Sequence, residues 1–303
     1  MGMTKNQLEL VKCVAQNDLQ KAKHAALACC AEDTTQKNAT YINRYRSMLQ
    51  AGGLNMIELP ANITSFASME DLSVTYKENR YYLTKEEKNI FQLIKNMYTV
   101  SQILMEKQIP YLNATLLYGE SGCGKTAFSR YVAYKMELPY LYVNFSKMLD
   151  SYLGGSAKNL NHLFNFINQQ QCVVMLDELD SLAVKRAYGT DGASSEISRT
   201  TTCLLQLLDA VTNDHIILAA TNLIDSIDPA VKRRFTEKHE IHRLSINDRR
   251  SFIIQYLTDA EFAYDEESLE RYVQEDQQQA EIMKHMTRCI ADMLLNNANK
   301  VIL

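Results

Sequence analysis

The chain has 303 residues, of which 46% are hydrophobic and 22% charged, so it can bury a sizeable core and is expected to form about two domains. Its ten glycines and four prolines are too few for a fibrous or low-complexity protein, and its apolar share excludes a wholly disordered chain. The net charge of −4 argues against a protein that holds nucleic acid or an anionic membrane through an overall positive field.

The N-terminal part of the chain carries a helical pattern. Apolar residues recur at helical spacing between Leu8 and Leu19, and an Ala-rich stretch follows, which predicts a helical hairpin over residues 5–30. A third helix is expected at 38–50. Together these segments predict an N-terminal helical module over residues 1–50.

A change of pattern follows this module. Residues 51–76 begin with Ala-Gly-Gly, contain Pro60 and show neither helical nor strand periodicity, so we interpret them as a linker. Thr84 and Glu87 then form the TxxE pattern of a capping box, which predicts the start of a long helix that stops before Pro110.

Residues 77–243 form the next predicted domain, and from residue 114 onward short apolar runs alternate with helical stretches. This alternation predicts an α/β fold in which a parallel five-stranded sheet is flanked by helices. No strand pattern returns after residue 243, and three helical patterns over 244–303 predict a small helical lid. The five predicted strands are residues 114–118, 141–144, 172–176, 216–220 and 238–243.

A glycine-rich motif follows the first of these strands. In a loop of this kind, placed before a helix, backbone N–H groups converge on phosphate oxygens, Lys125 reaches the β and γ phosphates, and the Thr126 hydroxyl ligates Mg²⁺. The alternative is a chance glycine turn, which composition alone produces in about one chain in a hundred. The predicted strand directly before the motif and the helical pattern directly after it favour a P-loop NTPase over a chance turn. The motif GxxxxGK[ST] is matched by Gly119-Glu120-Ser121-Gly122-Cys123-Gly124-Lys125-Thr126.

Polar side chains end the strands that follow. Asp177 and Glu178 come directly after the apolar run 172–176, where Asp177 would hold Mg²⁺ and Glu178 would polarise the attacking water. Asn222 follows the run 216–220 and could reach between the γ-phosphate and that water. Taken alone, the Asp-Glu pair could equally be an acidic end of a strand, and Asn222 is more often an ordinary turn residue.

These elements, in this order, resemble the AAA family of ATPases within the AAA+ class. The likeness rests on the phosphate loop, on the Asp-Glu pair, on AATN at 219–222 and on DPAVKRRF at 228–235. It implies that Asn222 is sensor 1 and that Arg233 and Arg234 are arginine fingers that reach the nucleotide of a neighbouring subunit. The sequence RRF is similar to the severing and scission, or meiotic, branch of the family, and leaves open which arginine is primary.

The resemblance also implies a substrate and an assembly. Tyr152 and Leu153 stand where the family has pore loop 1, and in a homo-oligomeric ring, expected to be a hexamer, they would grip an extended polypeptide; alternatively Tyr152 packs within its loop. The N-terminal module is similar to helical domains that dock a protein substrate or adaptor. A single cassette is typical of a stand-alone, bacterial-type ATPase with one nucleotide tier.

One departure from the family lies in the lid. Residues 275–280, Glu-Asp-Gln-Gln-Gln-Ala, replace a turn that usually contains glycine, and no sensor 2 residue is assigned.

The cysteines and the hydropathy predict the compartment. Seven cysteines form no CxxC pair, which indicates a reducing, cytoplasmic environment, and no apolar run reaches the roughly 18 residues of a membrane span.

We therefore predict an ATPase that uses ATP and Mg²⁺ and remodels protein by threading it through a pore. Two alternatives remain: a nucleic-acid-associated AAA+ ATPase of the helicase-loader or transposition type, and a nucleotide-switched regulatory adaptor.

Overall fold

The chain divides into two compact units, Met1–Glu58 with Ser73–Thr75, and Leu59–Leu72 with Tyr76–Leu303. A computed structural model describes residues 2–15, 19–33, 42, 46, 49, 59–109, 111–150, 155–169, 171–182, 192–211 and 215–303.

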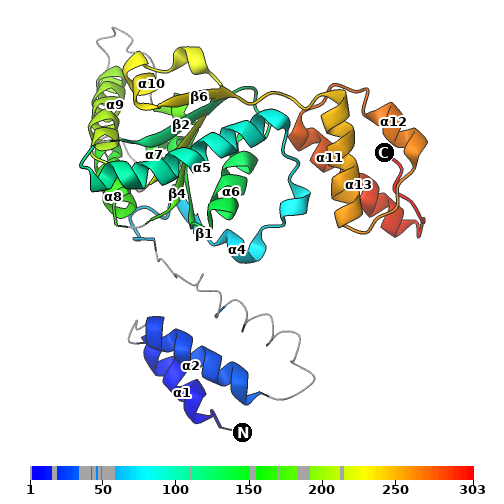
Figure 1. Cartoon of the computed structure of the whole chain (residues 1–303), viewed down its shortest axis with the longest axis horizontal. Coiled ribbons are helices and arrows are strands. Elements are labelled where there is room, and N and C mark those ends of the chain that lie inside the picture. The colour runs from blue at the N-terminus through cyan, green and yellow to red at the C-terminus, as the bar shows by residue number, and fades with distance from the viewer. Residues whose placement is uncertain are drawn as a thin grey trace. The chain divides into compact units, whose positions relative to one another are not determined.

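Two helices of the first unit are those predicted as a hairpin. Helices α1 (Lys5–Ala15) and α2 (Leu19–Glu32) lie side by side (Figure 1). Thr4 and Asn6, at the start of α1, donate hydrogen bonds of 3.0 and 2.7 Å to the Glu32 carboxylate at the end of α2. Most of the helix predicted at 38–50 lies outside the described residues.

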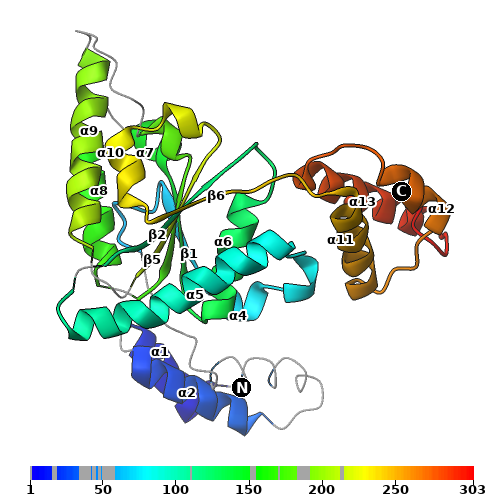
Figure 2. The ribbon, with the colours of Figure 1, turned by 45° about the horizontal axis from the view of Figure 1, so that its top comes forward.

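The second unit is built on a six-stranded sheet. All five predicted strands are present and pair in parallel, in the order β3-β4-β5-β2-β6, and β1 extends the sheet beside β3. Figure 2 shows the sheet nearly edge-on. The strands are β1 (Ala67–Glu70), β2 (Asn113–Tyr118), β3 (Tyr140–Asn144), β4 (Val173–Asp177), β5 (Ile216–Thr221) and β6 (Glu237–Glu240).

Strand β1 was not predicted and lies in the segment interpreted as a linker. It runs antiparallel to β3, with Ala67 opposite Val143 and Glu70 opposite Tyr140. Its four residues are at the lower limit of the roughly four to eight over which an alternating pattern is recognised, and Ala-Ser-Met-Glu contains no β-branched or aromatic residue that would indicate a strand. The buried side chain of Phe66 precedes it, so this part of the predicted linker belongs to the core of the second unit.

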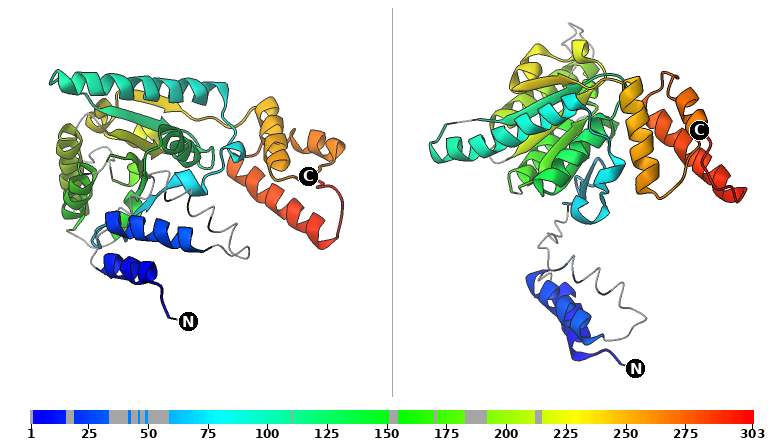
Figure 3. Two further views of the ribbon diagram at one scale, coloured as in Figure 1. Left: turned by 60° about the horizontal axis from the view of Figure 1, so that its bottom comes forward. Right: turned by 45° about the vertical axis from the view of Figure 1, so that its right-hand side comes forward.

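Helices cover both faces of the sheet, as predicted. Helices α5 (Lys85–Glu106) and α6 (Lys125–Met136) lie on one face, and α5 runs along it (Figure 3, left). Four others lie on the opposite face (Figure 2): α7 (Phe145–Asp150), α8 (Ser156–Ile167), α9 (Gly192–Asp209) and α10 (Pro229–Arg234). The short helices among the described residues between β1 and β6 are α4 (Leu72–Thr75), η1 (Glu78–Arg80), η2 (Leu179–Ser181) and η3 (Ile224–Ser226).

The predicted capping box at the start of α5 is confirmed. The Thr84 hydroxyl accepts a hydrogen bond of 3.2 Å from the backbone N–H of Glu87, and the Glu87 carboxylate accepts one of 2.9 Å from the backbone N–H of Thr84. Two of the N–H groups that a helix start leaves unpaired are thereby satisfied.

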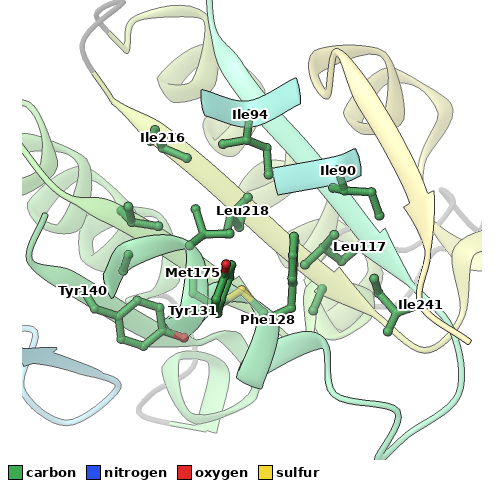
Figure 4. Packing of buried hydrophobic residues seen from close by; sticks show 14 of the residues in the cluster. Ile90, Ile94, Leu117, Phe128, Tyr131, Tyr140, Met175, Ile216, Leu218 and Ile241 are labelled. Atoms are coloured by element: carbon green, nitrogen blue, oxygen red, sulfur yellow. The ribbon is translucent and has the colours of Figure 1, made fainter. Parts of the chain in front are cut away.

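The core follows the two-residue period of the strands. Leu117 of β2 and Leu218 of β5 point toward α5 and α6, where they pack with Ile90, Ile94 and Phe128 (Figure 4). The intervening strand residues are buried on the other face. Full burial of one such apolar side chain stabilises the fold by about 1.5–3 kcal/mol, so this two-faced core fixes the sheet and the loops at its ends.

The lid is a group of three helices with a core of its own (Figure 3, right). It consists of α11 (Ile246–Asp259), α12 (Glu266–Tyr272) and α13 (Gln279–Leu295). Ser245 caps α11 by accepting a hydrogen bond from the backbone N–H of Asp248. Phe252, Leu269 and Ile282 meet in the buried cluster. Across the residues that the structure describes, none of the helices combines the length and apolar character needed to span a bilayer.

Candidate active site

The phosphate loop connects β2 to α6. Gly119, Gly122 and Gly124 have φ of 141°, 78° and 103°, a region that residues with a Cβ adopt only at a cost. Gly124 immediately precedes the 12-residue helix α6. The loop therefore ends at a helix N-terminus, where unpaired N–H groups and the helix dipole favour an anion.

Lys125 is held in place from three sides. Its Nζ donates hydrogen bonds of 2.8 Å each to the carbonyls of Gly119 and Glu120 and to Oδ1 of Asn222. These use all three donors of an ammonium group. The residue is only 7% exposed, and this burial lowers the pKa of Lys125 from its ordinary value, although nearby acidic groups oppose the shift.

The Thr126 hydroxyl and the Asp177 carboxylate, two oxygen groups that can ligate a metal ion, lie together beside the loop. The Thr126 hydroxyl donates to Oδ2 of Asp177 across 3.1 Å, and the Tyr142 hydroxyl donates to the same oxygen across 3.1 Å. Hydroxyl and carboxylate oxygens at the phosphate-binding loop are the ligands that Mg²⁺ takes in such sites. This donor set fits Mg²⁺, and burial together with Asp177 raises the pKa of Tyr142.

Glu178 lies in an unusual backbone conformation directly after β4. Its φ of 57° and ψ of 45° are left-handed, which costs a residue with a Cβ about 1–2 kcal/mol. Its backbone N–H donates to Oδ1 of Asp177 across 2.9 Å. Within the described residues, no hydrogen bond or ion pair to its own carboxylate is found. Left-handed residues with a Cβ cluster at functional sites, and the Glu178 carboxylate has no bonding partner among these residues, so it is available for chemistry.

Asn222 is fixed at the end of the neighbouring strand β5. Asp180 accepts a hydrogen bond of 2.7 Å from the Thr221 hydroxyl and one of 3.3 Å from the backbone N–H of Asn222. Asp180 follows β4, so it ties the ends of two adjacent strands together. This leaves the Asn222 amide directed to Lys125.

The two candidate arginine fingers are placed differently on α10. Arg234 makes a two-pronged ion pair with Asp209 of α9, at 3.0 and 2.9 Å, which raises the pKa of Arg234 and lowers that of Asp209. Arg233 is exposed, and the residues described here provide it with no hydrogen bond or ion pair. Asp228 caps the helix through the N–H of Ala230 at 2.7 Å.

The structure thus brings Lys125, Thr126, Asp177, Glu178 and Asn222 together at the carboxyl ends of β2, β4 and β5. The predicted pore residues Tyr152 and Leu153 lie outside the described residues.

Several contacting residues were missed by sequence reasoning. Tyr142 lies on β3, two residues before that strand ends, and Asp180 lies just beyond the Asp-Glu pair; neither belongs to a motif with a fixed offset. Arg243, Gln278 and Gln279 also contact the loop. The only signal for the last two was the departure from the usual lid turn.

Comparison with known proteins gives a domain-level match. Residues 115–243 match the family described as "ATPase family associated with various cellular activities (AAA)". The chain is 28% identical over 215 residues, 68% of its length, to an uncharacterized AAA family ATPase of Sinorhizobium fredii, of which it covers 64%.

Proteasomal proteins are also similar to this chain. A 26S proteasome regulatory subunit 10B homolog of Arabidopsis thaliana is 37% identical over 131 residues, 42% of this chain and 33% of the relative. A 26S proteasome regulatory subunit 8 homolog of Saccharomyces cerevisiae is 31% identical over 154 residues, 50% of this chain and 38% of the relative. The chain thus spans less than two thirds of the length of each of these three relatives.

Proposed function

We propose that this chain hydrolyses ATP and uses the energy to remodel protein as one subunit of a ring, because residues 115–243 match the AAA family of ATPases. The observation that carries the proposal is the meeting of Lys125, Asn222 and the Thr126–Asp177 pair at one edge of the sheet. Each of these groups has a task in phosphoryl transfer to water.

The loop binds and orients the triphosphate. Its N–H groups and the N-terminus of α6 take the phosphate oxygens, and Lys125 turns from the loop carbonyls toward the β and γ phosphates. Thr126 and Asp177 would hold Mg²⁺, which when bound neutralises part of the phosphate charge. The Asp177 carboxylate keeps its orientation through Tyr142 and the Glu178 N–H.

Glu178 and Asn222 act on the attacking water. The free Glu178 carboxylate accepts a proton from that water, while the Asn222 amide holds it in line with the γ-phosphate. In a ring, Arg233 or Arg234 of the adjacent copy adds positive charge to the transition state. Hydrolysis then depends on assembly, because a lone subunit lacks this guanidinium group.

Protein is the proposed substrate. Support comes from the proteasomal relatives, from the net charge of −4, which disfavours nucleic acid, and from Tyr152 and Leu153 as candidate pore residues. Helix α1 exposes Leu8, Val11 and Val14, an apolar set that suits residues 1–50 to docking a protein substrate or adaptor. Seven free cysteines agree with a cytoplasmic protein.

The test uses Glu178→Gln. This variant should bind ATP with an affinity close to that of the wild type, hydrolyse it at least a hundredfold more slowly, and accumulate as an ATP-bound ring in sizing experiments. The matched control is Glu240→Gln, an exposed carboxylate on β6. Hydrolysis by Glu178→Gln at the wild-type rate would refute this role of Glu178.

Substrate class is decided by stimulation. An unfolded polypeptide should raise the ATPase rate of the wild type, and Tyr152→Ala should lose this response while retaining the unstimulated rate. Salt-sensitive stimulation by DNA or RNA would favour the nucleic-acid alternative. A Tyr152→Ala protein that keeps its stimulation would favour a nucleotide-switched adaptor.

A further inference from the structure

The lid touches the phosphate loop at the start of α13. The Ala280 N–H donates to the Gly122 carbonyl across 3.2 Å. A Cβ on Gly122 would meet the side-chain oxygen of Gln278, and one on Gly124 would overlap that of Gln279. The positive φ of both positions favours glycine, and the two glutamine side chains of the lid pack directly on the loop.

Arg243 bridges the same two parts. It lies in the connection between β6 and α11, its Nε donates to Oε2 of Glu120 across 2.7 Å, and its Nη2 forms an ion pair with the same oxygen at 2.6 Å. Its Nη1 donates to Oδ2 of Asp276 across 3.0 Å. The Arg243 guanidinium group therefore binds the carboxylate of Glu120 in the phosphate loop and the carboxylate of Asp276 in the lid turn, and its planar arrangement of N–H donors suits it to bind two carboxylates.

The lid end of this bridge is anchored in the lid core. The other oxygen of Asp276 accepts from Nη2 of Arg249 across 3.2 Å. Arg249 is 3% exposed and also donates to the carbonyls of Val273, Glu275 and Leu244. Asp276 is therefore linked through Arg249 to the end of α12 and to the residue before α11. A displacement of Asp276 relative to the phosphate loop would accordingly move the lid helices with it.

The loop end is connected to the phosphate-binding lysine. The Glu120 carbonyl accepts from Lys125 Nζ, while the Glu120 carboxylate is held by Arg243. Lys125 has no donor left over, since its three are used. A bound phosphate must therefore take at least one donor from Glu120, Gly119 or Asn222, which changes the loop at the residue tied to the lid.

We propose that Arg243 is a positioning residue: with Glu120 and Asp276 it forms a clasp that holds the start of α13 against the phosphate loop and couples lid position to nucleotide occupancy. The proposal rests on the proposed ATP-binding function of the same loop. By linkage, a clasp that favours nucleotide binding is itself strengthened when nucleotide is bound.

The clasp is of moderate strength. The side chains of Glu120 and Asp276 are 61% and 73% exposed, against 35% for Arg243, and exposed ion pairs contribute little individually. A bridging guanidinium with two carboxylates contributes more than an isolated pair, and we expect its loss to weaken nucleotide binding about threefold to tenfold.

The first experiment compares Arg243→Gln with the wild type. The Kd for a fluorescent ADP analogue and the KM for ATP should rise about threefold to tenfold, while kcat stays within about twofold, because no group that touches the reacting atoms is removed. Without nucleotide, amide hydrogen exchange at the start of α13, including Ala280, should be faster in the variant. Arg243→Lys should recover part of each effect.

A matched control is present on the same lid. Arg250 pairs with Glu266 and Glu270, all within the lid, and Arg250→Gln should leave nucleotide affinity and exchange at Ala280 unchanged. Glu120→Gln should reproduce the faster exchange, and adding Arg243→Gln to it should have little further effect, because both changes open the same contact.

Failure of the clasp is distinguishable from failure of the ATPase proposal. A wild type that binds no nucleotide would overturn the function, yet exchange at Ala280 without nucleotide would still report on the clasp. An Arg243→Gln protein with wild-type Kd, KM and exchange would overturn the clasp alone. Should Arg243→Gln not fold, Asp276→Asn carries the same expectations, since it removes only the charge of an exposed carboxylate.

Discussion

The Lys125 ammonium group donates a hydrogen bond to the Asn222 side-chain oxygen across 2.8 Å. The two residues are 97 positions apart, and they meet because β2 and β5 pair in parallel with Tyr118 opposite Thr221. The loop that begins after β2 therefore lies beside the polar end of β5. A phosphate that enters the loop comes within reach of both side chains at once.

Replacing Asn222 tests whether this contact serves chemistry or binding. In Asn222→Ala, ATP affinity should stay within a few-fold of the wild type, because the loop N–H groups are intact, while kcat should fall about tenfold to a hundredfold through loss of a polar group aimed at the reacting water. Steady-state kinetics with a separate binding assay measures both. Asn296→Ala, at the end of α13, is the control; an unchanged kcat for Asn222→Ala would remove Asn222 from the mechanism.

The two arginines of α10 should be unequal. Arg233 is exposed, whereas Arg234 is occupied by Asp209, so Arg233→Ala should lose ATPase activity at least a hundredfold and Arg234→Ala less. Nucleotide affinity should change little in either. A mixture of Arg233→Ala with Lys125→Ala subunits should recover some activity, because an intact finger then faces an intact loop in some pairs.

The opposite order would assign the primary role to Arg234. In that case Asp209→Asn, which frees Arg234 from its ion pair, should also alter the rate. If Asp209→Asn retains the wild-type rate and only stability falls, the Arg234–Asp209 pair is structural.

Replacing Tyr142 should change the dependence of the ATPase rate on Mg²⁺ concentration. Its hydroxyl donates to the same Asp177 oxygen as Thr126, so Tyr142→Phe leaves this carboxylate less firmly oriented. We expect the Mg²⁺ concentration for half-maximal ATPase activity to change about twofold to tenfold, as it does when partners of metal ligands are removed. Tyr134→Phe, on α6, is the control. Equal Mg²⁺ dependence in the two variants would make Tyr142 a packing residue.

Local signals in the sequence predicted much of the fold. The cap at Thr84 is visible because its hydroxyl and the carboxylate of Glu87, three positions later, bond to each other's backbone N–H groups, a contact within one turn. The central strands β4 and β5 are apolar on both faces because helices cover both, and this leaves a continuous apolar run. The phosphate loop is visible because its glycines, lysine and threonine stand at fixed spacing within eight consecutive residues.

Contacts between distant segments could not be predicted in this way. Strand β1 pairs with β3 across about 70 residues of sequence, and its four residues, Ala-Ser-Met-Glu, carry no pattern that specifies this partner. Tyr142, Asp180 and Arg243 reach the site through the sheet register and the lid position. Their residue types are ordinary at strand ends and on surfaces, so only the fold reveals their partners.

The capping box of α5 should make stability depend on pH. Glu87 is 6% exposed, and burial raises its pKa above the ordinary value of 4.5, although hydrogen bonds from Tyr81 and Thr84 oppose the shift. The folded protein therefore binds this proton more tightly than the unfolded chain does. The resulting stabilisation is fully present below about pH 4.5 and is lost as the pH rises through the raised pKa.

Glu87→Gln isolates this contribution, because glutamine retains the capping geometry and the bond from Tyr81 but cannot ionise. The free energy of unfolding of the variant, relative to the wild type, should increase from pH 4.5 to pH 8 by about 1.4 kcal/mol for each unit by which burial raises the pKa. Urea titrations at several pH values measure this difference. Glu86→Gln, exposed in the same turn, should show no such trend, and a Glu87→Gln protein that loses stability relative to the wild type as the pH rises would mean that the bonds from Tyr81 and Thr84 outweigh burial.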